Sequence, residues 1–254
     1  PPKYLEFKAD DGETLYGQLL LPSEGNGSGK IPLIISVYGG PAGQLVKNSW
    51  GDGTELFHQL LSRRGFAIFS VDNRGTPDRG RQFSASIRKQ CGAIELKDQL
   101  SALNSLLAQY PQLDKDRIGV WGWSNGGSMT LYSMTHSQMF KAGVSVAPVT
   151  DWHNYDSIYT ERYMGLPRDN VKGYEDSSIP KAAGNLHGAL LLVHGTSDDN
   201  VHLQNSIQMI NALVKADKPF HLMMYPDKTH SISGAAARTH LFQMMLDHWE
   251  HELK

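Results

Sequence analysis

The 254 residues include 24 Lys and Arg against 26 Asp and Glu, so the net charge is only −2. A chain so nearly neutral gives no sign of the large basic surface that would attract a nucleic acid. Its length fits one large α/β domain over residues 1–254. Cys91 is the only cysteine, which excludes an intrachain disulfide and leaves cytoplasmic and periplasmic or secreted locations equally open. No apolar run is long enough to cross a membrane.

Apolar patterns predict the elements of the N-terminal part. Residues 4–8 and 14–21 alternate as strands do, and the turn Asp10-Asp11-Gly12 between them predicts a hairpin. The Gly-, Ser- and Asn-rich stretch 24–30 predicts a mobile surface loop. Three segments follow, namely a buried strand at 33–37, an amphipathic helix at 52–64 and a second buried strand at 67–71.

The rest of the chain continues this alternation. We expect helices at 94–110, 128–134, 203–216 and 236–253, and strands at 117–121, 142–146, 189–193 and 220–225. The intervening stretch 150–180 is polar, rich in aromatic residues and weakly periodic, which indicates an inserted cap or loop near a functional site. Strands that alternate with helices form βαβ units, and these build a mostly parallel sheet covered on both faces. The expected fold is α/β, and the following motif makes it an α/β-hydrolase.

The motif Gly122-x-Ser124-x-Gly126 joins a predicted strand to a predicted helix, as a nucleophile elbow does. A serine at so sharp a turn has strained backbone angles, and glycines two positions away on either side avoid a collision. The turn exposes the hydroxyl at the carboxyl end of the strand, where the helix start offers N–H groups to an oxyanion. An ordinary Gly- and Ser-rich loop is the alternative, but the flanking elements and a further glycine, Gly127, favour the elbow.

A serine nucleophile needs a base, and the base needs an orienting acid. In α/β-hydrolases the order along the chain is Ser, then Asp or Glu, then His. Asp198 follows the predicted strand at 189–193 and is the candidate acid, with Asp199 as its neighbouring rival. Asp198 could instead be a turn residue that caps the next helix. His230 follows the last predicted strand and is the candidate base.

Four other histidines are weaker candidates, because His221 lies within a predicted strand and the rest lie in the predicted terminal helix. We expect them to pack or to face solvent; they are His221, His240, His248 and His251. His248 and His251 are three positions apart and could bind a metal, but no third ligand is evident. We interpret them as a surface pair and expect no metal and no cofactor.

An oxyanion hole requires hydrogen-bond donors aimed at the tetrahedral oxygen. The backbone N–H of Asn125, directly after the nucleophile, is one candidate donor. A second donor should come from the loop Tyr38-Gly39-Gly40-Pro41, where the Tyr38 hydroxyl could serve. The alternative for Tyr38 is packing at the end of its strand.

Four stretches carry a family resemblance. They are VYGGP at 37–41, GWSNGG at 122–127, DSIYTERYMGLP at 156–167 and HGTSDDNVH at 194–202. Together they resemble the prolyl oligopeptidase family of serine peptidases, and within it the C-terminal catalytic domain of the dipeptidyl peptidase IV branch. The third and fourth stretches go well beyond what the fold requires, and the resemblance covers nearly the whole chain.

The resemblance implies roles for particular residues. Ser124, Asp198 and His230 match the family's catalytic triad, and Tyr38 matches its oxyanion tyrosine. In the family, one pocket holds the proline ring or alanine methyl before the scissile bond, and the residues that match it here are Trp152, Tyr155, Tyr159 and Val201. Asn200 matches a family residue that contacts the substrate backbone. Aromatic faces hold a flat proline ring well, and the pocket carries no charge that would favour Lys or Arg. Ordinary packing of the cap is the alternative role for these side chains.

The sequence departs from the family in two respects. Asn125 stands where the dipeptidyl peptidase IV branch has a tyrosine, although its backbone N–H is retained. The family also has an N-terminal β-propeller, whose side supplies the acidic groups that bind a free substrate amino terminus. Because this chain opens Pro1-Pro2 without a methionine, we expect it to be an excised domain of a longer protein.

The resemblance predicts a serine exopeptidase that cleaves peptides after Pro or Ala near the amino terminus. Its expected partners are the peptide substrate, the β-propeller of the full-length protein and, as one form of assembly, a second copy in a homodimer. A carboxylesterase with the same triad is the first alternative, since fold and triad serve both reactions. A non-catalytic interaction module is the second, and the intact Ser124, Asp198 and His230 argue against it.

Overall fold

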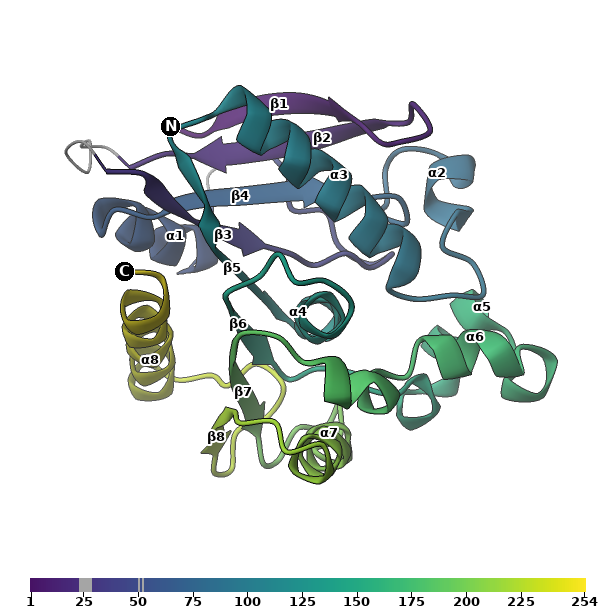
Figure 1. Cartoon of the computed structure of the whole chain (residues 1–254). Coiled ribbons are helices and arrows are strands. Elements are labelled where there is room, and N and C mark those ends of the chain that lie inside the picture. The colour runs from purple at the N-terminus through teal and green to yellow at the C-terminus, as the bar shows by residue number, and fades with distance from the viewer. Residues whose placement is uncertain (23–28, 50, 52) are drawn as a thin grey trace.

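The computed structural model describes residues 1–22, 29–49, 51 and 53–254. An eight-stranded sheet runs through it in the order β1-β2-β4-β3-β5-β6-β7-β8 (Figure 1). Its strands are β1 (Lys3–Lys8), β2 (Thr14–Leu20), β3 (Ile31–Ser36), β4 (Ala67–Asp72), β5 (Leu113–Trp123), β6 (Ala142–Val146), β7 (Ala189–Gly195) and β8 (His221–Tyr225). The pairings β1–β2 and β2–β4 are antiparallel, and the other five are parallel. The predicted mostly parallel α/β sheet is confirmed.

Helices cover both faces of this sheet (Figure 1). The apolar core on one face is shared with α3 (Ala93–Gln109), α4 (Asn125–His136) and α7 (Gln204–Lys215). The core on the other face is shared with α1 (Gly53–Arg63) and α8 (Ala235–Leu253). Strands β3, β4, β6 and β7 are covered on both sides, so nearly all of their residues are buried. This two-sided burial is why these strands are continuous apolar runs in the sequence.

The stretch 150–180 folds as a series of short helices rather than as an open loop. They are η1 (Trp152–Asn154), α5 (Ser157–Met164), η2 (Pro167–Asp169), α6 (Val171–Asp176) and η3 (Ile179–Asn185). Carboxylates cap the first two of these helices. Asp151 Oδ1 accepts from the N–H of His153 at 3.0 Å at the start of η1, and Asp156 Oδ1 accepts from that of Tyr159 at 2.8 Å at the start of α5. Helices of this length are too short to show a period in the sequence.

Other boundaries differ in detail from the sequence-based expectation. The strand β5 begins at Leu113, before the predicted start at 117, because its first half is polar and shows no apolar alternation. The short helix α2 (Arg81–Ala85) buries one side chain, Phe83, and has no pattern that predicts it. Most of the loop predicted at 24–30 lies outside the described residues, as does the predicted helix start at 52.

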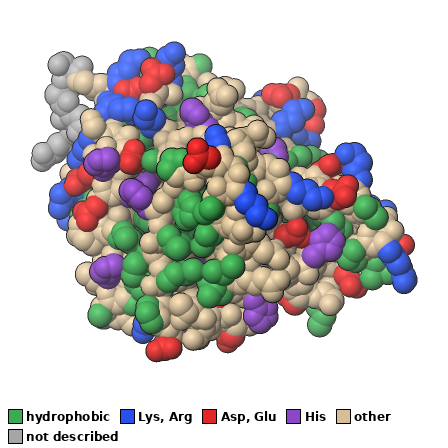
Figure 2. Space-filling model, turned by 60° about the horizontal axis from the view of Figure 1, so that its bottom comes forward, with side chains coloured by type: hydrophobic (Ala, Val, Ile, Leu, Met, Phe, Trp, Pro, Cys, Tyr) green, Lys and Arg blue, Asp and Glu red, His purple; other side chains and the backbone are tan. Residues whose placement is uncertain are grey.

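One edge of the sheet is apolar and has no neighbouring strand among the described residues. β8 is the last strand in the order and pairs with β7 alone. Exposed apolar side chains on this side include Ile207 and Val214 of α7 and Leu222 of β8. Figure 2 turns this side forward and shows hydrophobic side chains gathered near the middle of the view. The homodimer remains a prediction. Within the described ranges, no helix has the length and apolar character needed to cross a bilayer.

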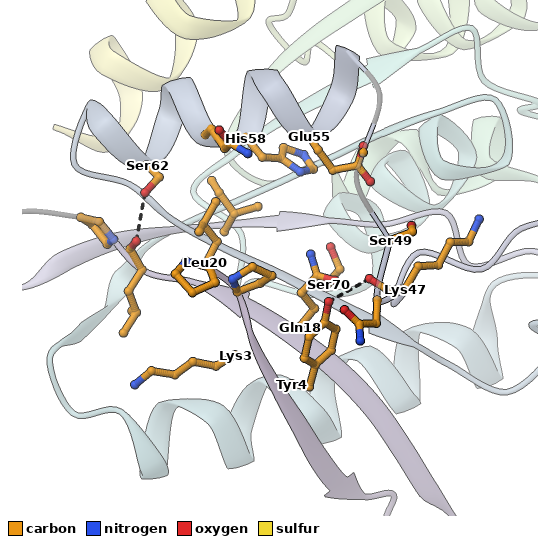
Figure 3. Close-up of a pocket in the computed structure, with 18 of the residues that line it drawn as sticks. Lys3, Tyr4, Gln18, Leu20, Lys47, Ser49, Glu55, His58, Ser62 and Ser70 are labelled. Carbon is orange, nitrogen blue, oxygen red and sulfur yellow. Dashed lines mark hydrogen bonds between the residues drawn. The ribbon is translucent and has the colours of Figure 1, made fainter.

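A cleft of about 810 Å³ lies between the N-terminal hairpin, β4 and α1 (Figure 3). The hydroxyl of Tyr4 donates to the Lys47 carbonyl at 3.0 Å across it, and the Ser62 hydroxyl donates to the Leu21 carbonyl at 2.9 Å. None of the residues predicted to take part in catalysis lines this cleft. The chemistry is therefore sought at the carboxyl edge of the parallel strands.

Candidate active site

The elbow predicted at Ser124 has the expected strained geometry. Strand β5 ends at Trp123, α4 begins at Asn125, and Ser124 between them has φ 61° and ψ −119°. Its N–H donates to the carbonyl of Val146 on β6 at 2.8 Å, which holds the turn against the sheet. A Cβ atom at Gly122 or at Gly126 would collide with the Val37 carbonyl oxygen. The two glycines therefore permit the close approach of β3, β5 and α4 that exposes the serine.

The candidate acid, Asp198, is buried in the turn after β7, whereas its rival Asp199 is exposed. Its Oδ1 accepts the backbone N–H groups of Asn200 and Val201 at 3.0 and 2.9 Å. Asp198 therefore holds its own turn, but it does not cap the next helix, α7, whose N-cap is Leu203 and has no side-chain cap hydrogen bond. Its Oδ2 accepts from His230 Nδ1 at 2.8 Å. Burial by itself would raise the pKa of Asp198, but hydrogen bonds from His194, His230 and Asn200 outweigh it and hold that pKa well below its ordinary value.

The candidate base, His230, is held from both sides. Because a carboxylate can only accept, the proton of the bond to Asp198 lies on Nδ1, and Nε2 presents a lone pair. The indole N–H of Trp123 donates to the His230 carbonyl at 2.9 Å, which places the base loop beside the end of β5. The guanidinium of Arg238 lies 4.6 Å from the centre of the Trp123 ring. The residue before the candidate nucleophile thus contacts the loop of the candidate base, a link that the sequence does not reveal.

The predicted oxyanion residues lie against each other. The side-chain amide of Asn125 donates to the Tyr38 carbonyl at 2.8 Å and so fixes the end of the β3 loop. A Cβ at Gly40 would lie within 2.5 Å of that amide, and a Cβ at Gly43 would lie 2.6 Å from the Tyr38 ring. Burial raises the pKa of Tyr38, with Tyr155 and Tyr163 adding to the effect, so its hydroxyl keeps its proton and remains a donor.

The interpretation of His248 and His251 as a surface pair is wrong for His248. Its side chain is buried beside Trp249, where α8 packs on the sheet, whereas His251 is exposed and contacts Glu252. His248 follows the buried stripe of the helix, and burial lowers its pKa. In the part of the chain that the structure describes, no three His, Cys, Asp or Glu side chains converge as metal ligands would.

Comparison with known proteins identifies the family. A model of the prolyl oligopeptidase family matches residues 54–254. The chain belongs to this family. The resemblance inferred from the sequence motifs is therefore confirmed, and with it the assignment to a family of serine peptidases.

Similar proteins in the family are substantially longer than this chain. Mouse prolyl endopeptidase FAP is 40% identical over 240 residues, which is 93% of this chain and 31% of that protein. Mouse dipeptidyl peptidase 8 is 38% identical over 257 residues, or 99% of this chain and 29% of that protein. The solved dipeptidyl peptidase 4 of Porphyromonas gingivalis superposes with a TM-score of 0.94 at 38% identity, over 100% of this chain and 36% of that one. These similarities confirm the α/β-hydrolase fold.

The predicted pocket residues form one aromatic cluster in this family member. Trp152 and Tyr159 stack with their ring centres 6.0 Å apart, and Tyr155 meets Tyr159 edge-on at 5.2 Å. Val201 belongs to the same apolar cluster, and the Tyr155 hydroxyl donates to Asn200 Oδ1 at 2.8 Å. The structure thus brings all five predicted pocket residues together, in a setting with no charged side chain among them.

Two buried polar residues next to this site escaped the sequence analysis. Glu95, in the first turn of α3, lines a small cavity together with Asn125, Trp152 and Tyr159. Burial raises the pKa of Glu95 to about 7. His194, in β7, contacts Asp198. Glu95 lies in none of the motifs singled out above, and His194 opens the stretch at 194–202 without a role of its own assigned there, so only the fold shows that their side chains are close to the site.

Proposed function

We propose that this chain is the catalytic domain of a serine exopeptidase that hydrolyses peptide bonds after Pro or Ala near the substrate amino terminus. In this proposal Ser124 is the nucleophile, His230 the base and Asp198 the orienting acid. The observation that carries it is the 2.8 Å contact between His230 Nδ1 and a buried Asp198, with the His230 carbonyl bonded at 2.9 Å to Trp123, the residue before the strained Ser124. Family membership supports the reaction class.

In the proposed reaction the Ser124 hydroxyl attacks the scissile carbonyl carbon while His230 Nε2 takes the hydroxyl proton. The carbonyl oxygen becomes an oxyanion and accepts from the Asn125 N–H and the Tyr38 hydroxyl. When the C–N bond breaks, His230 gives its proton to the departing amine and the acyl-enzyme remains. Water then attacks, losing a proton to His230, and Ser124 Oγ leaves with that proton. Asp198 stays ionised throughout and stabilises the imidazolium.

The aromatic cluster supports cleavage after a small or ring-shaped residue. A proline ring could lie against the faces of Tyr155 and Tyr159, with Val201 closing the pocket, and none of the five predicted pocket residues carries a charge that would pair with a Lys or Arg side chain. An esterase would need the same triad, so the aromatic cluster is the feature that favours the peptidase. A non-catalytic module is disfavoured by the satisfied hydrogen bonds of Asp198.

The test is covalent labelling with a fluorophosphonate, followed by hydrolysis of chromogenic X-Pro and X-Lys amides. We expect the chain to be labelled and to prefer X-Pro, and Ser124→Ala to abolish labelling while leaving the fold intact, with a loss of about a million-fold in kcat. Labelling of Ser124→Ala would refute the nucleophile. Equal turnover of X-Lys and X-Pro would refute the proline pocket and favour an esterase.

The whole protein's specificity is a further part of the proposal. The chain spans about a third of the length of the relatives named above, so an N-terminal β-propeller is proposed to complete the substrate site. Remote binding energy would then be absent from the isolated chain, and both kcat and KM should suffer. We expect little preference for a free over a blocked amino terminus. A strong preference for the free amine would place the amine-binding group within these 254 residues.

A further inference from the structure

A second histidine contacts the carboxylate that holds His230. His194 lies in β7, and no part of its side chain is exposed. Its Nε2 is 3.2 Å from Asp198 Oδ2, the same oxygen that accepts from His230, and 2.8 Å from the Val201 carbonyl oxygen. Two imidazole rings, one from β7 and one from the loop after β8, therefore converge on one carboxylate oxygen.

The neighbours of His194 identify where its proton lies. The carboxylate and the Val201 carbonyl can only accept, so Nε2 carries a proton shared between them. The other ring nitrogen, Nδ1, lies 2.7 Å from the hydroxyl oxygen of Ser206, a buried residue of α7. Within the described residues that hydroxyl has no other hydrogen-bond partner, so it donates its proton to Nδ1. His194 is thereby oriented with its donor nitrogen, Nε2, toward Asp198.

We propose that His194 is a positioning residue of the reaction, held by Ser206, and that it controls how strongly Asp198 attracts the proton of His230. The inference rests on the proposed catalytic triad. A donor on Oδ2 withdraws negative charge from the oxygen that His230 contacts, which makes the imidazolium form of His230 less favourable. The same donor fixes the plane of the carboxylate together with the N–H groups of Asn200 and Val201.

A purely structural role for His194 would have a different signature. Its bond to the Val201 carbonyl also ties β7 to the turn that carries Asp198, and loss of that tie would lower the rate at every pH alike. Loss of the donor to Oδ2 would in addition raise the pKa of His230, because Asp198 would hold the imidazolium more tightly. The titratable groups that interact at this carboxylate are His194 from β7, His230 from the loop after β8 and Tyr155 from the cap.

The experiment measures the rate of fluorophosphonate labelling of this chain across pH, because labelling requires His230 to be neutral. His194→Leu removes the donor to Asp198. In the plot of labelling rate against pH, we expect the rise on the acid side, the acid limb, to move up by roughly half to one pH unit and the plateau rate to fall by about tenfold or more. His194→Gln, whose amide can reach Asp198, should return the limb toward the wild-type position. Ser206→Ala, which frees the ring to rotate its proton, should move the limb in the same direction by less.

The outcomes separate this inference from the proposed function. A lower plateau with an unmoved limb in both His194→Leu and Ser206→Ala would overturn the positioning role and leave the triad intact. Absence of labelling in the wild type would overturn the triad, and the histidine titration can then be followed by NMR, where His230 must still titrate higher in Ser206→Ala. Should His194→Leu fail to fold, the comparison of Ser206→Ala with His194→Gln still decides the question.

Discussion

The turn after β7 and the first turn of α3 each bury a carboxyl group, and the two regions leave it in opposite states. Asp198 and Glu95 are 6% and 2% exposed, so both are nearly closed to solvent, but Glu95 lies deeper within the protein. Asp198 accepts from two histidine rings and two backbone N–H groups, and its pKa is lowered. The side chain of Glu95 has a weak bond from Gln90 Nε2 at 3.2 Å, and burial raises its pKa to about 7.

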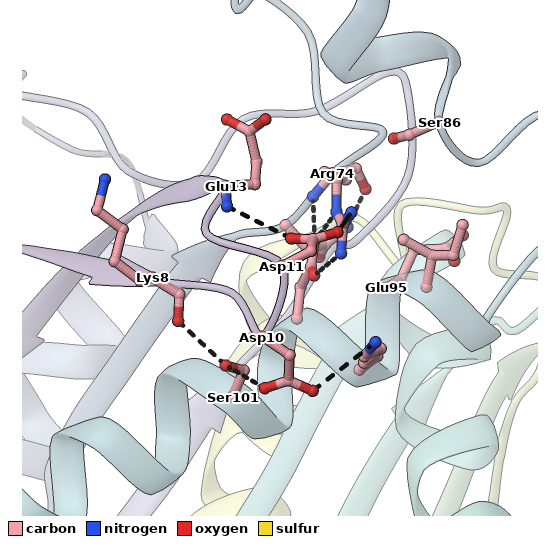
Figure 4. A network of polar contacts seen from close by, with 12 residues as sticks. Lys8, Asp10, Asp11, Glu13, Arg74, Ser86, Glu95 and Ser101 are labelled. Carbon is pink, nitrogen blue, oxygen red and sulfur yellow. Dashed lines mark hydrogen bonds and ion pairs between the residues drawn. The ribbon is translucent and has the colours of Figure 1, made fainter.

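Directed donors at Asp198 and deeper burial at Glu95 together decide which of the two carboxylates stays charged at this edge of the sheet. A third acid, Asp98, lies one turn after Glu95 on the same helix and illustrates another solution. Its buried side chain accepts from the guanidinium of Arg74 at 2.6 and 3.0 Å and from the Arg74 N–H at 2.9 Å. Arg74 also pairs with Asp11 in the hairpin turn (Figure 4), so α3 is tied to β1 and β2 through one cation.

The largest expected effect is on kcat/KM and comes from neutralising Asp198. Asp198→Asn keeps the volume of the side chain but favours the wrong tautomer of His230, and kcat/KM for an X-Pro amide should fall about ten-thousandfold. The matched control is Asp199→Asn, because Asp199 is exposed and has no assigned contact to His230. A greater loss in Asp199→Asn than in Asp198→Asn would show that Asp198 is not the orienting acid.

The next largest effect is on the free energy of unfolding and concerns the ion pair of Asp98 with Arg74. Arg74→Ala leaves Asp98 buried without its partner, and the free energy of unfolding should fall by roughly 3 to 5 kcal/mol. Lys97→Ala serves as the control, since Lys97 and Asp10 form an exposed pair 3.8 Å apart that should be worth less than about 1 kcal/mol. Urea unfolding at one pH measures both, and equal small losses would show that α3 does not rely on Arg74.

The smallest effect tests Glu95, whose hydrogen-bond donors do not offset its burial. The pKa of Glu95 is about 7 in the folded chain against an ordinary 4.5, so between these values the folded state binds a proton that the unfolded state has lost. Stability must then fall as pH rises from about 4.5 to 7, by up to about 3 kcal/mol. Glu95→Gln removes this penalty, and its advantage over wild type should be small at pH 4.5 and near its maximum at pH 8. An advantage that does not change with pH would contradict the assignment.

The predictable parts of the molecule are those in which one short stretch carries both the pattern and the chemistry. The elbow at Ser124 needs glycines at fixed spacing, and the parallel strands need apolar runs, so both follow from the sequence. The placement of Asp198 and His230 follows from the rule that polar residues collect after parallel strands. Their mutual hydrogen bond now supports that expectation.

Other features depend on contacts between distant segments and leave no local signal. His194 occupies a position within a buried strand, where a histidine suggests packing, and its partner Ser206 belongs to the next helix. Glu95 lies on a helix whose polar residues suggest solvent, yet the cap covers it. The short helices of 150–180 are likewise held by side-chain caps and aromatic contacts that a periodicity cannot show.

The anchoring of His230 to Trp123 has a consequence for the order of events during synthesis. The two residues are 107 positions apart, and the strand that delivers His230, β8, is joined to the sheet through β7 alone. A chain that leaves the ribosome amino end first therefore completes the turn at Ser124 long before His230 is synthesised. If His230 is the base, a nascent chain of this kind should remain unreactive toward a fluorophosphonate until β8 docks on β7.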